Sequence, residues 1–166
     1  MNINTFLRKF RIEIISNRRE STKIAIKHFK GKSIVCAEIG VEDGYNARDL
    51  QKALNIKKFH LIDICPNKKA LKMNKGNEEW YLCPSSKADV PKCDFIYIDG
   101  NHEYKYVCND LVKYWKLVEK GGIMAGHDIQ YIGVSKAVLE FANKNKLQIN
   151  FGDKRDWWII KNEAGR

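Results

Sequence analysis

The fold is decided by residues 34–44, which read IVCAEIGVEDG. A continuous apolar run of this length is typical of a strand buried on both faces, and Gly40 and Gly44 indicate a tight turn after it. Residues 59–64 and 94–98 repeat the pattern, each with an acid at or just after its end. Helical patterns separate these runs. The alternation predicts an α/β fold whose mostly parallel sheet is covered on both faces.

Outward from this stretch, the 166 residues fit a single domain. We expect basic N-terminal helices in residues 1–32 and a Rossmann-like core over residues 33–161. Further strands are predicted at 80–83, 123–126, 147–151 and 157–161, the last two as an antiparallel pair because their connection is too short for a crossover helix. The predicted helices are 5–15, 21–29, 47–54, a weak one at 68–73, 107–118 with a stop at Gly121 and Gly122, and 134–143.

Composition narrows the class of protein. Hydrophobic residues make up 44% and charged residues 30%, which suits a soluble globular chain. The longest apolar runs fall far short of the roughly 20 residues that span a bilayer. Five cysteines without a C-x-x-C pair suggest neither a disulfide framework nor a zinc site. We therefore expect a cytoplasmic protein with no membrane span.

The net charge of +10 is unevenly distributed. Residues 1–32 hold nine Lys and Arg against two Glu, which gives +7. Such a basic face could bind nucleic acid, a phosphorylated sugar or an acidic lipid headgroup, although solvated lysine-rich faces are also common.

Polar side chains end the predicted strands. They are Glu38, Asp63, Asp99, His127 and Asp128. The carboxyl ends of parallel strands meet at one edge of a sheet, where ligands bind in α/β folds, so these side chains should face one crevice.

The turn after the first strand lacks the G-x-G-x-x-G spacing that admits a pyrophosphate, and Glu42 and Asp43 add negative charge there. This disfavours a dinucleotide. It favours a ligand with an ammonium and a sulfonium group, such as S-adenosylmethionine. Asp63 is placed to accept hydrogen bonds from ribose hydroxyls.

Four motifs in order resemble the class I S-adenosylmethionine-dependent methyltransferases, particularly the compact group whose fourth strand ends I-D-G-x-H. They are Glu38-x-Gly40-x-x-x-Gly44, Asp63, the IDGNHEY of residues 98–104 and the GGIMAGHD of residues 121–128. The resemblance covers about residues 33–161. It implies a seven-stranded sheet with the last strand antiparallel. It also implies that Glu38, Gly40 and Gly44 hold the methionine portion, Asp63 the ribose, and Ser85 and Ser86 the adenine, with Tyr45, Ile64 and Asp99 completing the cofactor site.

The resemblance extends to a possible metal site. His127 and Asp128 follow Asp99 by 28 and 29 residues, a spacing similar to that of the metal-binding acids in catechol-type O-methyltransferases. A histidine in place of the second acid departs from that family, and imidazole shifts the preference from magnesium towards manganese, iron or zinc. We expect a divalent cation, magnesium or manganese, on Asp99, His127 and Asp128. His102 stands where that family has a catalytic lysine and could act as a general base. Alternatively, both histidines only line the cofactor crevice.

The leading hypothesis is methylation of a hydroxyl on a small molecule or sugar, with Asp99 and His102 as catalytic residues; the basic N-terminal residues favour an anionic acceptor. An RNA methyltransferase is the second, because of the basic N-terminal residues, and a cofactor-binding module without catalysis is the third. No sequence motif names the acceptor.

Overall fold

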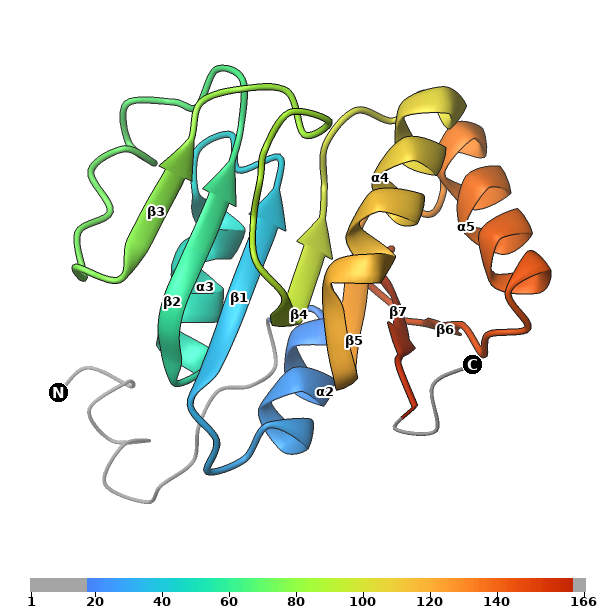
Figure 1. Ribbon diagram of the computed structural model, residues 1–166, viewed down its shortest axis with the longest axis horizontal. Helices are drawn as coiled ribbons and strands as arrows, with labels where there is room; N and C mark the ends of the chain where they lie inside the picture. Colours follow the sequence, from blue (N-terminus) through green and yellow to red (C-terminus); the bar gives the residue numbers. More distant parts are fainter. Residues whose placement is uncertain (1–17, 163–166) are drawn as a thin grey trace, which may run out of the picture.

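Seven strands form one sheet within residues 18–162, the part of the chain that the computed structural model describes (Figure 1). The strands are β1 (Ile34–Ile39), β2 (Ile56–Ile62), β3 (Glu78–Tyr81), β4 (Cys93–Ile98), β5 (Val118–Gly126), β6 (Asn150–Phe151) and β7 (Trp157–Ile160), in the order β3-β2-β1-β4-β5-β7-β6. Strands β1 to β5 are parallel, whereas β7 runs antiparallel to β5 and to β6. The predicted doubly wound sheet with an antiparallel last strand is confirmed.

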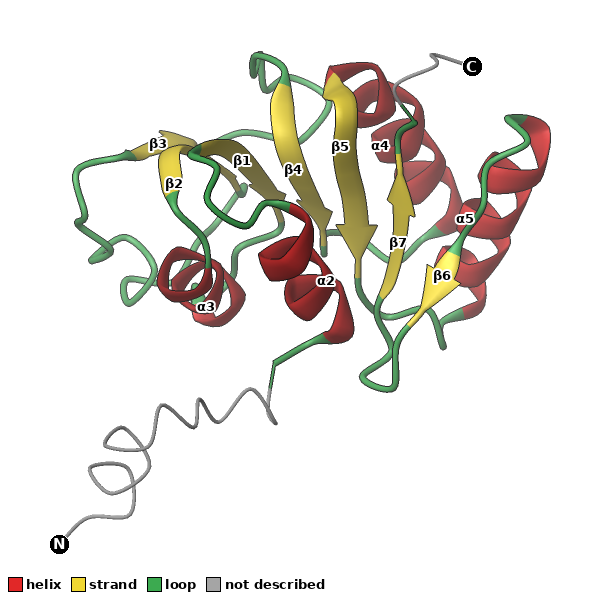
Figure 2. Ribbon diagram, turned by 90° about the horizontal axis from the view of Figure 1, so that it is seen from below, coloured by secondary structure: helices red, strands yellow, loops and turns green. Residues whose placement is uncertain are grey.

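Helices cover both faces of this sheet (Figure 2). In the described part of the chain they are α2 (Glu20–His28), α3 (Tyr45–Ala53), α4 (Tyr104–Leu117) and α5 (Ile132–Lys144). Phe59 and Phe95 are buried in the core on the α2 and α3 side, while Ile96 and Leu111 are buried in the core on the α4 and α5 side. None of these helices is long and apolar enough to cross a membrane.

The parallel register brings the carboxyl ends of four strands into one row. Ile39 of β1 pairs with Ile62 of β2 and with Ile98 of β4, and Ile98 in turn pairs with Gly126 of β5. The next residues along the chain are Gly40, Asp63, Asp99 and His127. The strand-end residues singled out in the sequence therefore meet at one edge of the sheet.

Gly40 allows β1 and β4 to approach closely at this edge. Its φ is +81°, in the left-handed region, and a Cβ atom there would lie 2.1 Å from the carbonyl oxygen of Asp99. The Asp99 amide donates to the carbonyl of Ile39 at 2.7 Å, which holds the two strand ends together. Glycine is therefore required at position 40 by both backbone conformation and space.

Two predicted helices are wrong in whole or in part. Residues 68–73 form turns, because the side chain of Asn67 accepts a hydrogen bond from the Lys69 amide and its carbonyl accepts one from Ala70. The helix expected to reach 118 ends at Leu117, since Val118 already pairs with β4, and the glycines predicted to stop it belong to β5. The helix predicted at 5–15 lies outside the described residues.

Candidate active site

A cavity of about 830 Å³ opens at the carboxyl ends of β1, β2, β4 and β5. Most of the predicted site residues line it: Glu38, Gly40, Tyr45, Asp63, Ile64, Ser85, Asp99, His102, His127 and Asp128. Gly44 and Ser86 do not. Gly44 instead turns the chain into α3 with a φ of +74°, and Ser86 is exposed beside Ser85.

The cavity is strongly acidic. Seven carboxyl groups line it: Glu38, Glu42, Asp43, Asp63, Asp99, Asp110 and Asp128. Among the residues that the structure describes, neither a lysine nor an arginine is part of the lining. Because like charges repel more strongly where water is partly excluded, such a cavity disfavours phosphate groups and favours a cationic ligand.

Glu38 is the most deeply placed of these acids. Its side chain is 1% exposed, and its Oε2 atom has no hydrogen-bond partner among the described residues. Burial raises the pKa of Glu38 to about 8. A buried carboxyl oxygen without a hydrogen-bond donor is destabilising, and an ammonium group would supply both the hydrogen bond and a positive charge.

Asp63 shapes the turn that carries Glu42. Its Oδ2 atom accepts hydrogen bonds from the Val41 and Glu42 amides, and its Oδ1 atom accepts one from the Cys65 amide, each at 2.8 Å. A carboxylate has about four acceptor positions, so about one remains for a ligand hydroxyl. If Asp63 accepts hydrogen bonds from two ribose hydroxyls, as predicted, part of this hydrogen-bond network must therefore rearrange.

Asp110 is a site residue that sequence reasoning missed. It lies within α4, is 4% exposed, and its Oδ1 atom accepts a hydrogen bond from the Ser85 hydroxyl at 2.6 Å. Burial raises the pKa of its carboxyl. The available signal was its position beside Leu111 and three residues after Val107, which places an acid on the apolar face of the helix.

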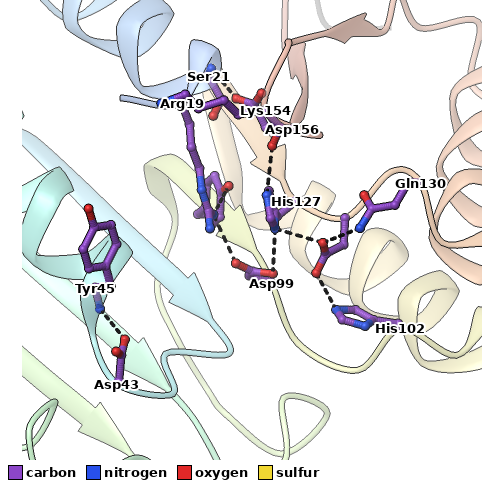
Figure 3. Close-up of polar contacts among 12 residues, drawn as sticks. Arg19, Ser21, Asp43, Tyr45, Asp99, His102, His127, Gln130, Lys154 and Asp156 are labelled. Carbon is purple, nitrogen blue, oxygen red and sulfur yellow. Dashed lines mark hydrogen bonds and ion pairs between the residues drawn. The ribbon is translucent and has the colours of Figure 1, made fainter. Parts of the chain in front are cut away.

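Four acidic and imidazole side chains of the cavity lining form one cluster, and three of them are labelled in Figure 3. They are Asp99, His102, His127 and Asp128. The Nε2 atom of His102 lies 2.9 Å from Oδ2 of Asp128. The Nδ1 atom of His127 lies 3.2 Å from Oδ1 of Asp128 and 3.8 Å from Oδ1 of Asp99.

Asp128 is fixed at the centre of this cluster. Its φ of +58° is unusual for a residue other than glycine, and such conformations persist where surrounding contacts determine them. Burial opposes the charge of Asp128, but the hydrogen bond from Gln130 and the imidazoles of His127 and His102 outweigh it, so the pKa of the carboxyl is lowered. Asp128 is therefore a stable anion between two histidines.

The two histidines are held in different ways. The Nε2 atom of His127 donates to the Lys154 carbonyl at 2.9 Å, which turns its Nδ1 atom towards the carboxylates. His102 is 43% exposed and stacks on Tyr131, with 4.7 Å between ring centres and 15° between planes. Since its Nε2 atom faces Asp128, the Nδ1 atom of His102 remains able to accept a proton.

This donor set also fits a divalent cation. One ligand atom each of Asp99, His102 and Asp128 lies within 4.8 Å of the other two. The sequence predicted a cation bound by Asp99, His127 and Asp128, with His127 rather than His102 as the nitrogen ligand. The Nδ1 atom of His127 also faces both carboxylates. Mixed carboxylate and imidazole ligands suit manganese, iron or zinc better than magnesium.

Arg18 and Arg19, two of the nine basic residues within residues 1–32, precede α2. Each makes an ion pair within the protein. Arg18 lies 3.2 Å from Asp49 of α3, and Arg19 lies 3.1 Å from Asp99. Both guanidinium groups are largely covered, at 22% and 23% exposure, so charge-reversal at these positions would break internal contacts as well as change the surface.

Comparison with known proteins agrees with this geometry. Residues 37–129 match the model of a family described as a methyltransferase domain, and because the match covers more than half of the chain, the protein belongs to that family. Its sheet and helices are those of the class I S-adenosylmethionine-dependent methyltransferases.

Individual relatives are more distant. An uncharacterized protein, R132, of Acanthamoeba polyphaga mimivirus is 39% identical over 59 residues, which are 36% of this chain and only 27% of the viral protein. The N-methyltransferase NodS of Bradyrhizobium japonicum in complex with S-adenosylhomocysteine matches with a TM-score of 0.63 and 13% identity over 86% of each chain. An rRNA methylase of Streptococcus thermophilus matches with a TM-score of 0.63 and 14% identity, over 85% of this chain and 92% of that one. The identities of 13% and 14% to these two solved structures establish a shared fold only.

Proposed function

We propose that the protein transfers the methyl group of S-adenosylmethionine to a hydroxyl oxygen of a small molecule or sugar. The observation that carries the cofactor assignment is the acidic cavity, with an unpartnered carboxylate oxygen of Glu38 buried within it. When bound, S-adenosylmethionine supplies an activated methyl group. The protein's own residues must bind the cofactor, orient the acceptor and remove its proton.

The cavity lining suggests how the cofactor is divided among the strand ends. We assign the methionine portion to Glu38 and the turn at Gly40 and Gly44, with the unpartnered oxygen of Glu38 available to an ammonium group. The remaining acceptor position of Asp63 suits a ribose hydroxyl. For the adenine we propose the turn at Ser85 and Ser86, with Tyr45 and Ile64 as apolar contacts. Asp110 adds a buried acceptor beside Ser85.

His102 is the proposed general base. Asp128 orients its ring through Nε2, Tyr131 supports its face, and Nδ1 takes the proton from the acceptor hydroxyl as the oxygen gains the methyl group. Asp128 then stabilises the imidazolium that forms. Asp99, at the end of β4, would face both the cofactor and the acceptor.

A divalent cation is the second element of the proposal. Asp99, His127 and Asp128 would hold it, and it would lower the pKa of the acceptor hydroxyl. This assignment is supported by the position of His127, whose Nδ1 atom lies 3.2 Å from Oδ1 of Asp128 and 3.8 Å from Oδ1 of Asp99. The imidazole of His102 lies within 4.8 Å of the same two carboxylates and is the alternative nitrogen ligand. A cation would also reduce the repulsion between an anionic acceptor and the carboxylates of the cavity.

The remaining assignments concern the surroundings of the enzyme. All five cysteines are free, which is consistent with a reducing, cytoplasmic location.

The net charge of +10 and the likeness to an rRNA methylase keep RNA as the second candidate acceptor. If RNA is the acceptor, the affinity of the protein for RNA should fall steeply as the salt concentration rises.

Calorimetry and a transfer assay test these proposals together. We expect S-adenosylhomocysteine to bind and NAD not to bind. Tritiated S-adenosylmethionine would then be incubated with a catechol, a set of methyl glycosides and transcribed RNA, with and without EDTA. Label in a hydroxyl compound supports the proposal, whereas label only in RNA replaces it with the second candidate. Cofactor binding without transfer to any of these favours a module without catalysis.

A further inference from the structure

Arg19 connects the segment before α2 to the cluster of Asp99, His102, His127 and Asp128. Its Nη1 atom donates to Oδ2 of Asp99 at 3.1 Å and to the hydroxyl of Tyr97. The guanidinium carbon also lies 5.2 Å from the centre of the Tyr97 ring, which is completely buried. Figure 3 shows Arg19 and His127 each directed at a different oxygen of Asp99. These contacts fix the guanidinium against one oxygen of the carboxylate.

The helix that follows Arg19 is itself anchored to the same site. Asp156 is fully buried, and its Oδ2 atom accepts a hydrogen bond from the Ser21 amide in the first turn of α2 at 2.6 Å. The loop that ends at Asp156 also contains Lys154, whose carbonyl accepts the hydrogen bond from His127. One loop therefore positions both the helix of Arg19 and a histidine of the cluster.

The two oxygens of Asp99 consequently have different partners. Oδ2 is bonded to Arg19, whereas Oδ1 faces Nδ1 of His127. Oδ1 is therefore the oxygen on the side of the cluster, while Oδ2 is turned to the guanidinium. Any cation bound within the cluster would also be repelled by the adjacent guanidinium, whose charge is retained because Tyr97 and Asp99 outweigh the effect of burial and raise the pKa of Arg19.

We propose that Arg19 sets the affinity of this cluster for divalent cations, by restricting Asp99 to one ligand oxygen and by placing a fixed positive charge beside it. The cluster therefore exchanges a cation readily instead of retaining it. This inference rests on the proposed function, because it treats Asp99, Asp128 and the histidines as the site that a cation would occupy.

The test is a Mn²⁺ titration of the full chain, with free Mn²⁺ measured by electron paramagnetic resonance. We expect Arg19→Met to bind Mn²⁺ at least about tenfold more tightly than the unmodified protein, because a positive charge next to the ion is removed. Arg18→Met is the matched control. It loses an ion pair of similar length and exposure outside the cavity, and should match the unmodified protein within about twofold.

Two further variants locate the effect. Arg19→Lys retains the charge and should stay near the unmodified affinity, while Asp99→Asn in the Arg19→Met background should abolish the gain. Arg19→Gln, which loses the charge but keeps a hydrogen-bond donor, replaces Arg19→Met if urea unfolding shows that the latter does not fold. Equal Mn²⁺ affinity with and without the arginine, whether strong or undetectable, overturns the inference, and so does a gain that survives Asp99→Asn.

Calorimetry with S-adenosylhomocysteine on the same proteins separates this inference from the proposed function. If the unmodified protein binds S-adenosylhomocysteine but the variants show no change in Mn²⁺ affinity, only the role of Arg19 is lost. If S-adenosylhomocysteine does not bind, the proposed function is lost whatever the Mn²⁺ result.

Discussion

Replacing Gly40 with alanine tests the geometry on which the whole site depends. The added Cβ would lie 2.1 Å from the carbonyl oxygen of Asp99, 2.5 Å from its carbonyl carbon and 2.7 Å from the Cα of Gly100. All three neighbours are backbone atoms at the end of β4, so no side chain can rotate away. The ends of β1 and β4 must separate by roughly 1 Å to reach ordinary contact distances.

The expected loss of stability has two parts. A left-handed backbone costs an alanine about 1–2 kcal/mol relative to glycine. Separation of the strands also weakens the hydrogen bond from the Asp99 amide to Ile39, worth about 1–3 kcal/mol when a buried group is left without a partner. Together, Gly40→Ala should lower the free energy of unfolding by about 2–5 kcal/mol, a large share of the stability of a typical domain.

Gly31 provides the matched control. Its φ of +76° is nearly the same as that of Gly40, but a Cβ there would meet nothing within 4 Å. Urea unfolding of Gly31→Ala should therefore show only the backbone part, about 1–2 kcal/mol. Calorimetry should show loss of S-adenosylhomocysteine binding in Gly40→Ala alone. If both variants lose the same stability and both still bind, the close approach of the strands is not what requires glycine.

Three further changes test the chemistry of the site. His102→Ala should lower turnover by about 10²- to 10⁴-fold, the range for a lost general base, while calorimetry shows unchanged affinity for S-adenosylhomocysteine. Asp128→Ala should abolish transfer and also leave cofactor affinity nearly intact, and under the metal proposal EDTA should do the same to the unmodified enzyme. Asp63→Ala should weaken cofactor binding by about 1.5–3 kcal/mol, and it should also lower stability in urea, because three backbone amides lose their acceptor. Burial raises the pKa of Glu38 from 4.5 to about 8, so the unfolded chain releases this proton first and the free protein should lose stability as the pH rises between these values. Glu38→Gln should remove that part of the pH dependence in urea unfolding at pH 5 and pH 8.

The strand ends were predictable because their signal is local. Each parallel strand is a short apolar run, and the polar residue after it must emerge at the same edge as its neighbours. The register confirms this for Gly40, Asp63, Asp99 and His127. The prediction of a helix at 68–73 was wrong because its apolar spacing was weak and the side chain of Asn67 stabilises a turn in its place.

Contacts between distant segments could not be read from the sequence. Arg19 and Asp99 are 80 positions apart, and the sequence shows the charge of each without showing that they meet. The same holds for Ser85 and Asp110, 25 positions apart. Both pairs depend on how the helices pack against the ends of the sheet. The pattern of apolar residues predicts that the helices pack on the sheet, but it does not predict which polar side chains meet.

The charge of the chain illustrates the same limit with a functional consequence. A net charge of +10 predicts attraction of acidic partners, yet the cavity is lined by carboxylates and by no described lysine or arginine. Long-range attraction depends on the net charge, whereas binding within about 10 Å depends on the nearest groups, because salt screens the rest. An anionic acceptor would therefore be attracted to the protein as a whole but repelled at the site itself. Arg19 already offsets the charge of Asp99, and a divalent cation bound within the cluster would offset that of Asp128 and so allow such an acceptor to bind.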